Sequence, residues 1–78
     1  MELSGVVERQ QVASGSKSDR VAVVLVTPHR RYWLRRRGEH PYEDPVLDRL
    51  VGSHLRAEGS LAGPWFILDR WETIDRDT

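Results

Sequence analysis

Arginine and tryptophan side chains concentrate in one short segment, residues 30–37. Five arginines lie within these eight residues, and Trp33 lies between them. An indole ring offers a surface on which a nucleic-acid base stacks, and a guanidinium group neutralises phosphate, so the combination is typical of single-strand binding. Together with a lysine from an earlier loop, the candidate ligand-binding residues are Lys17, Arg31, Trp33, Arg35 and Arg37.

The overall charge of the chain argues against a dedicated nucleic-acid binder. Twelve basic and twelve acidic residues give a net charge of zero, and the isoelectric point is near 6.8. Nucleic-acid-binding domains usually carry a clear excess of positive charge. Four carboxylates just downstream are able to neutralise part of the arginine segment: Glu39, Glu43, Asp44 and Asp48. Binding of single-stranded DNA or RNA is therefore the alternative hypothesis rather than the first.

The leading hypothesis is protein contact, and it comes from residues 65–74. In a strand, alternate side chains face opposite ways, so Phe66 and Leu68 would enter the core while Trp65, Ile67 and Trp71 share the other face. The reverse assignment, with the tryptophans inside, is also open. Contiguous exposed aromatic side chains mark a protein interface or a homodimer contact, whereas packing within one monomer would leave no such surface. We expect a non-catalytic binding module for a protein partner or a second copy, through this face or through residues 20–36.

The chain offers little for catalysis or for metal binding. It contains no cysteine, and the histidines His29, His40 and His54 are 11 and 14 residues apart, which fits no local metal-ligand spacing. Residues 14–18 include a Gly-x-Lys-Ser sequence but lack the earlier glycine and the following helix of a phosphate loop. We therefore predict no enzymatic activity, no cofactor and no metal.

The 78 residues have room for one domain, residues 1–78, with a frayed C-terminus at about 75–78. The longest apolar run, residues 21–26, is far too short to cross a membrane. No signal sequence is evident at the start, and cysteine is absent. These features predict a cytoplasmic protein with no membrane partner.

Five strands and one helix are expected to position the candidate residues. Alternating or β-branched patterns predict strands over residues 3–12, 20–27, 31–36, 53–61 and 65–74. Asp44 followed by Pro45 is typical of a helix start, and Gly52 of a helix end, with a short apolar stripe between them. This order predicts an all-β, five-stranded OB-like barrel with one short helix between the third and fourth strands. An SH3-like barrel is the rival fold, disfavoured by the helix.

The loop between residues 20–27 and 31–36 decides which way Trp33 faces. A loop of two or four residues assigns one set of side chains to the barrel interior: Val21, Val23, Leu25, Tyr32, Leu34 and Arg36. The other set would then lie outside: Ala22, Val24, Val26, Arg31, Trp33 and Arg35. A three-residue loop would instead place Trp33 on the face that carries Leu25.

Six short segments resemble those of small stand-alone bacterial OB-fold proteins of uncharacterised function. They are Gly-Ser-Lys-Ser at 15–18, Val-Val-Leu at 23–25, Leu-Arg-Arg at 34–36, Asp-Pro at 44–45, Leu-Val-Gly at 50–52 and Gly-Ser-Leu at 59–61. The resemblance extends from about Gly5 to Trp71. It implies the fold, and it implies that the outer face of the second and third strands is the usual ligand surface. It does not choose among nucleic acid, sugar and protein as the ligand.

Overall fold

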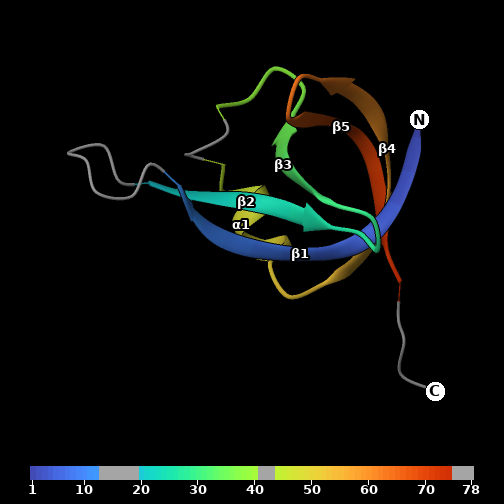
Figure 1. The fold of residues 1–78 in the computed structure, drawn as a ribbon, viewed down its shortest axis with the longest axis horizontal. Helices are drawn as coiled ribbons and strands as arrows, with labels where there is room; N and C mark the ends of the chain where they lie inside the picture. Colours follow the sequence, from blue (N-terminus) through green and yellow to red (C-terminus); the bar gives the residue numbers. More distant parts are fainter. Residues whose placement is uncertain (13–19, 41–43, 75–78) are drawn as a thin grey trace.

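A computed structural model describes residues 1–12, 20–40 and 44–74 of the chain (Figure 1). The elements are the strands β1 (Glu2–Val12), β2 (Arg20–Val26) and β3 (Arg31–Arg36), the helix α1 (Pro45–Leu50), and the strands β4 (His54–Ala62) and β5 (Trp65–Thr73). The strands close into one barrel in the order β1-β2-β3-β5-β4. The prediction of a small all-β, five-stranded barrel with one helix between the third and fourth strands is confirmed. Lys17 and the predicted fraying at 75–78 fall outside the described residues.

Apolar side chains from every strand fill the barrel, and α1 closes one end of it. Leu47 and Leu50 of α1 join the interior cluster, and α1 lies behind β1 and β2 in Figure 1. As predicted, Asp44 is the N-cap, Pro45 is the first helical residue, and Gly52 adopts a positive φ of 93° just after the helix. Such a short helix is not stable by itself, so its packing against the barrel maintains it. The core residues are Val7, Val23, Leu25, Leu34, Leu47, Leu50, Leu55, Ala57, Phe66 and Leu68.

Two glycines allow the strands to curve tightly enough for closure. A Cβ atom at Gly5 would lie 2.3 Å from the Val26 carbonyl oxygen, and one at Gly59 would lie 1.9 Å from the Ile67 carbonyl oxygen. Both distances are shorter than any real contact, so only glycine fits where these backbones approach. Gly5 lies where β1 leaves β2 and continues along β4, because Val6 pairs with both strands. Gly5 therefore marks the point at which β1 changes its partner strand.

The β2–β3 hairpin has a four-residue loop, which fixes the direction of Trp33. Val26 pairs with Arg31 and Val24 pairs with Trp33, so Trp33 lies on the outside of the barrel. Inside the loop, the Thr27 hydroxyl accepts hydrogen bonds from the backbone N–H groups of His29 and Arg30 at 3.3 and 3.2 Å. The even-numbered loop and the interior and exterior sets that it predicts are confirmed, with Val21 as the exception.

Val21 is 54% exposed rather than interior. It pairs with Gln11 of β1, whereas β2 pairs with β3 only through residues 24–26. In Figure 1 the β1 and β2 ribbons extend past the rest of the barrel at this end. The prediction that Val21 faces the barrel interior is wrong, because β1 and the start of β2 extend beyond the side chains that would cover Val21.

A bulge in β5 reverses which side chains in the second half of the strand point into the barrel. Gly59 pairs with Leu68 and Glu58 pairs with Arg70, which leaves Asp69 as an extra residue in β5. One extra residue shifts the alternation by one position. Trp71 therefore lies opposite Ala57 and packs against the core. The prediction that Trp71 shares an outer face with Trp65 and Ile67 is wrong for this reason.

Candidate ligand-binding face

The outer surface of β2, β3 and β5 brings together most of the candidate residues from two separate parts of the sequence. Strands β3 and β5 are parallel neighbours, with Trp33 opposite Trp65 and Arg35 opposite Ile67. Arg31 lies two residues before Trp33 on the same side of β3. We call this surface the tryptophan face and define it by the residues Ala22, Val24, Arg31, Trp33, Arg35, Trp65 and Ile67.

Two half-buried tryptophans form the centre of the tryptophan face. The ring centroids of Trp33 and Trp65 are 5.3 Å apart, and the rings meet edge to face at 69°. On β2, Val24 pairs with Trp33, and Ala22 and Val24 are each only 1% exposed although they lie outside the main core cluster. The backbone N–H of Trp33 donates a hydrogen bond of 3.1 Å to the carbonyl of Pro64, so the β4–β5 turn borders the face. An edge-to-face pair is a favourable and rigid arrangement of aromatic rings.

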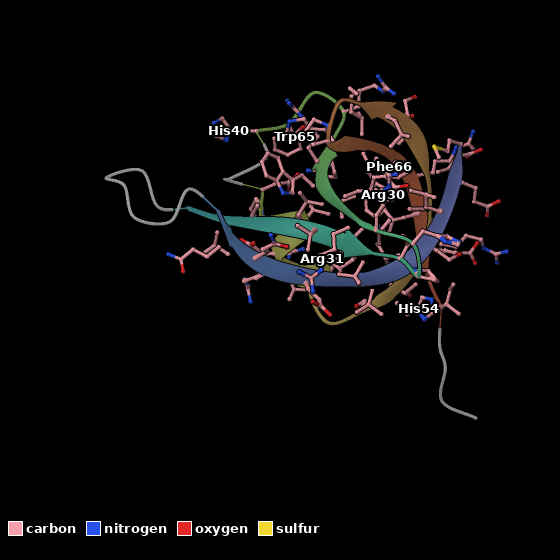
Figure 2. All side chains as sticks on the ribbon, viewed as in Figure 1. Arg30, Arg31, His40, His54, Trp65 and Phe66 are labelled. Carbon is pink, nitrogen blue, oxygen red and sulfur yellow. The ribbon has the colours of Figure 1, made fainter. Side chains whose placement is uncertain are left out.

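Arg35 lies against this aromatic pair. Its guanidinium carbon is 5.5 Å from the ring centroid of Trp65, which is cation–π distance. One guanidinium nitrogen, Nη2, donates to the backbone carbonyl of Glu39 at 3.3 Å. The carbonyl is neutral, so the positive charge of Arg35 is oriented but not cancelled. Figure 2 shows Trp65 at one end of the barrel on the side of His40, far from His54.

Among the described residues, no acidic side chain forms an ion pair with Arg30, Arg31 or Arg35. The ion pairs that are present are Arg36–Asp44, Arg37–Asp69, Arg56–Glu2, Arg56–Glu72 and Arg70–Glu58. Three of them join β1, β4 and β5 on a different part of the barrel. Local charge is therefore unbalanced, because the tryptophan face keeps its positive charges while the β1–β4–β5 side is neutralised by cross-strand pairs.

As predicted, Asp44 neutralises part of the arginine segment: it pairs with Arg36, which does not belong to the tryptophan face. Its carboxylate accepts from Arg36 Nε at 2.8 Å and Arg36 Nη2 at 3.0 Å, and from the Val46 backbone N–H at 3.0 Å. The hydrogen bonds from Arg36 hold the pKa of Asp44 below its usual value, although burial opposes that shift. This pair connects the end of β3 to α1.

Arg37, another candidate ligand-binding residue, is neutralised by the bulge residue of β5. Its guanidinium donates to both carboxylate oxygens of Asp69, with Nη2 at 3.0 Å from Oδ2, and to the hydroxyl of Ser60 at 3.4 Å. The hydrogen bonds between them raise the pKa of Arg37 and lower that of Asp69. Arg37 directly follows the last residue of β3 and does not present an unbalanced charge.

Five of the candidate residues converge on one face: Arg31, Trp33, Arg35, Trp65 and Ile67. Arg37 borders it as an ion pair, Trp71 packs against the core, and Lys17 lies outside the described residues. Sequence reasoning treated the arginine segment and the aromatic strand as two separate surfaces. Only the parallel pairing of β3 with β5, between residues about 30 positions apart, shows that they are one.

The rest of the described structure contains weaker candidates for a functional site. An open hollow of about 280 Å³ beside Trp71 is lined by Glu2, Arg56, Glu58, Arg70 and Glu72, whose charges largely pair with one another. His54 is half-buried, and its Nδ1 atom has no hydrogen-bond partner among the described residues. Within the described ranges, no three His, Asp or Glu side chains are placed to hold a metal ion. No helix of those ranges is long and apolar enough to span a membrane.

Comparisons with protein-family models, with curated proteins and with solved structures found no match. The function of the chain is therefore inferred from the geometry of the tryptophan face.

Proposed function

We propose that this chain is a non-catalytic, bacterial OB-fold module, cytoplasmic in location, that binds single-stranded nucleic acid through the tryptophan face. One observation carries the proposal: Trp33 and Trp65 lie side by side, next to Arg35, on a face whose arginines have no acidic partner among the described residues. The strand order β1-β2-β3-β5-β4, with α1 between β3 and β4, supports the OB fold. In that fold the outer face of the second and third strands is the usual ligand surface.

The same geometry weakens the hypothesis of protein contact. The form of that hypothesis that uses β5 needed a continuous apolar surface there, but Trp71 packs against the core and Trp65 contacts both Trp33 and Arg35. The large hydrophobic side chains that are most exposed among the described residues are Met1, Val21 and Leu61. None of these belongs to the tryptophan face. What remains there is a small aromatic surface next to positive charge, which suits a stacked base better than a second protein.

In this mechanism the two kinds of side chain have separate tasks. Trp33 and Trp65 provide stacking surfaces, and base–aromatic stacking contributes about 1–3 kcal/mol per base with little dependence on sequence. Arg31 and Arg35 neutralise phosphates on either side of Trp33, and they are separated by about 13 Å along β3 at about 3.3 Å per residue. Neither task requires a covalent step, a metal or a cofactor.

A salt-dependent titration tests the proposal. A fluorescently labelled thymidine oligonucleotide of about 15 nucleotides covers the footprint of one OB fold. We expect an increase in fluorescence anisotropy on addition of protein, stronger for the single strand than for a duplex of the same length. Two phosphate contacts predict a slope of log K against log salt of about −1.4, at about −0.7 per contact for single strands.

The contrary results are equally specific. Absence of binding at low salt would overturn the proposal. Binding of duplex and single strand with equal affinity would exclude base stacking. Concentration-dependent self-association in light scattering, abolished by Ile67→Asp, would instead support the leading hypothesis from the sequence, a protein interface on this face.

A further inference from the structure

One more cation follows directly after the outer residues of β3. Arg31, Trp33 and Arg35 alternate on the outer side of β3, which ends at Arg36, and Arg37 is the next residue of the chain. The backbone N–H of Arg37 donates to the carbonyl of Leu68 at 3.2 Å, so Arg37 stays beside β5 at the end of this row. By position alone, Arg37 would be the next phosphate contact after Arg35.

Asp69 lies beside Arg37 because each directly follows one member of the last β3–β5 pair, Arg36 opposite Leu68. Asp69 accepts from the guanidinium with both carboxylate oxygens, and Ser60 of β4 accepts a further hydrogen bond. A bidentate pair fixes the guanidinium more firmly than a single contact does. A phosphate at this point would also meet the negative charge of Asp69.

We propose that Asp69 determines where the nucleic-acid track ends: by holding Arg37 and by repelling phosphate, it limits the site to the two contacts of Arg31 and Arg35. This inference rests on the proposed function of the tryptophan face. It makes Asp69 a specificity-determining residue that acts through Arg37, and it explains why the basic segment contributes less positive charge than its sequence suggests.

The test is Asp69→Asn, which removes the negative charge but keeps the shape of the side chain. With the same thymidine oligonucleotide, we expect tighter binding and a steeper slope of log K against log salt. The slope should change from about −1.4 to about −2.1, because one further phosphate contact adds about −0.7.

Two control variants separate this local effect from a change in overall charge. Glu72 of β5 forms an exposed ion pair with Arg56, away from the tryptophan face. Glu72→Gln removes the same negative charge as Asp69→Asn and should leave the affinity and the slope unchanged. The double variant Asp69→Asn/Arg37→Gln leaves both positions neutral and should return the slope to the wild-type value. Circular dichroism of each variant verifies that the barrel is folded.

The outcomes distinguish this inference from the function on which it rests. If neither the wild type nor Asp69→Asn binds the oligonucleotide, both are overturned. If the wild type binds but Asp69→Asn leaves the slope unchanged, or gives the same affinity and slope as Glu72→Gln, only the proposed role of Asp69 is overturned. The proposed function then still stands. Weaker binding by the double variant than by the wild type would also overturn it, because Arg37 would then contact phosphate in the native protein.

Discussion

Replacing Asp44 with alanine is expected to lower the free energy of unfolding by about 3 kcal/mol, the low end of the usual cost of removing one partner of a buried ion pair, because this pair is only partly buried. The Asp44 side chain is 1% exposed, and that of Arg36 is 25% exposed. Without the carboxylate, the guanidinium of Arg36 would stay partly buried with no counter-charge, and the N-cap of α1 would be lost. Domains of this kind have about 5–15 kcal/mol of stability, so this one residue maintains a large part of it.

Urea denaturation followed by tryptophan fluorescence measures this effect. The matched control is Asp48→Ala, which removes an exposed carboxylate from the first turn of the same helix. Because the pKa of Asp44 is lower in the folded protein than its ordinary value of 3.8, its stabilisation is complete above that value and decreases as the pH falls further. Asp44→Asn should therefore flatten the acid side of the stability profile. A loss for Asp44→Ala no larger than for Asp48→Ala would contradict this account.

Arg35→Glu is expected to lower the affinity for the thymidine oligonucleotide by about 10- to 100-fold at low salt. A hydrogen bond to a charged group contributes about 1.5–3 kcal/mol, and the substitution removes one such contact with phosphate. The new carboxylate would also repel the phosphate and end the cation–π contact with Trp65. The slope of log K against log salt should become shallower than about −0.7, the value for a single remaining contact.

Arg49→Glu is the matched control for this charge reversal. Arg49 is an exposed residue in the last turn of α1 and does not belong to the tryptophan face. Both variants change the net charge by the same amount, so a difference between them reports the position of the charge. Equal affinities for the two variants would show that only overall charge matters, and would contradict the assignment of Arg35.

Local sequence patterns predicted the elements well because their causes are local. The strands predicted over residues 31–36 and 65–74 are β3 and β5, and Asp44 before Pro45 marks the start of α1 as predicted. The sequence left open whether the loop after β2 has an even number of residues or three. The pairing of Val26 with Arg31 shows that it has four. Each of these features depends on residues within a few positions of one another.

The arrangement of the candidate site was less predictable because its causes are not local. The parallel pairing that places Trp33 beside Trp65 joins residues 32 positions apart, and nothing near either tryptophan encodes it. The bulge at Asp69 depends on the close approach of Gly59 to β5, and it determines the facing of Trp71. The sequence likewise showed acids near arginines, but it did not indicate that Asp44 pairs with Arg36 or Asp69 with Arg37.

The most direct test of the central claim uses the three tryptophans as reporters. Each indole N–H gives one signal in a proton–nitrogen NMR spectrum of the labelled protein, and single-site substitution assigns it. On titration with the thymidine oligonucleotide, we predict that the signals of Trp33 and Trp65 shift together while that of Trp71, packed against the core, stays in place. Unchanged signals for Trp33 and Trp65, or a shift confined to Trp71, would contradict binding at the tryptophan face.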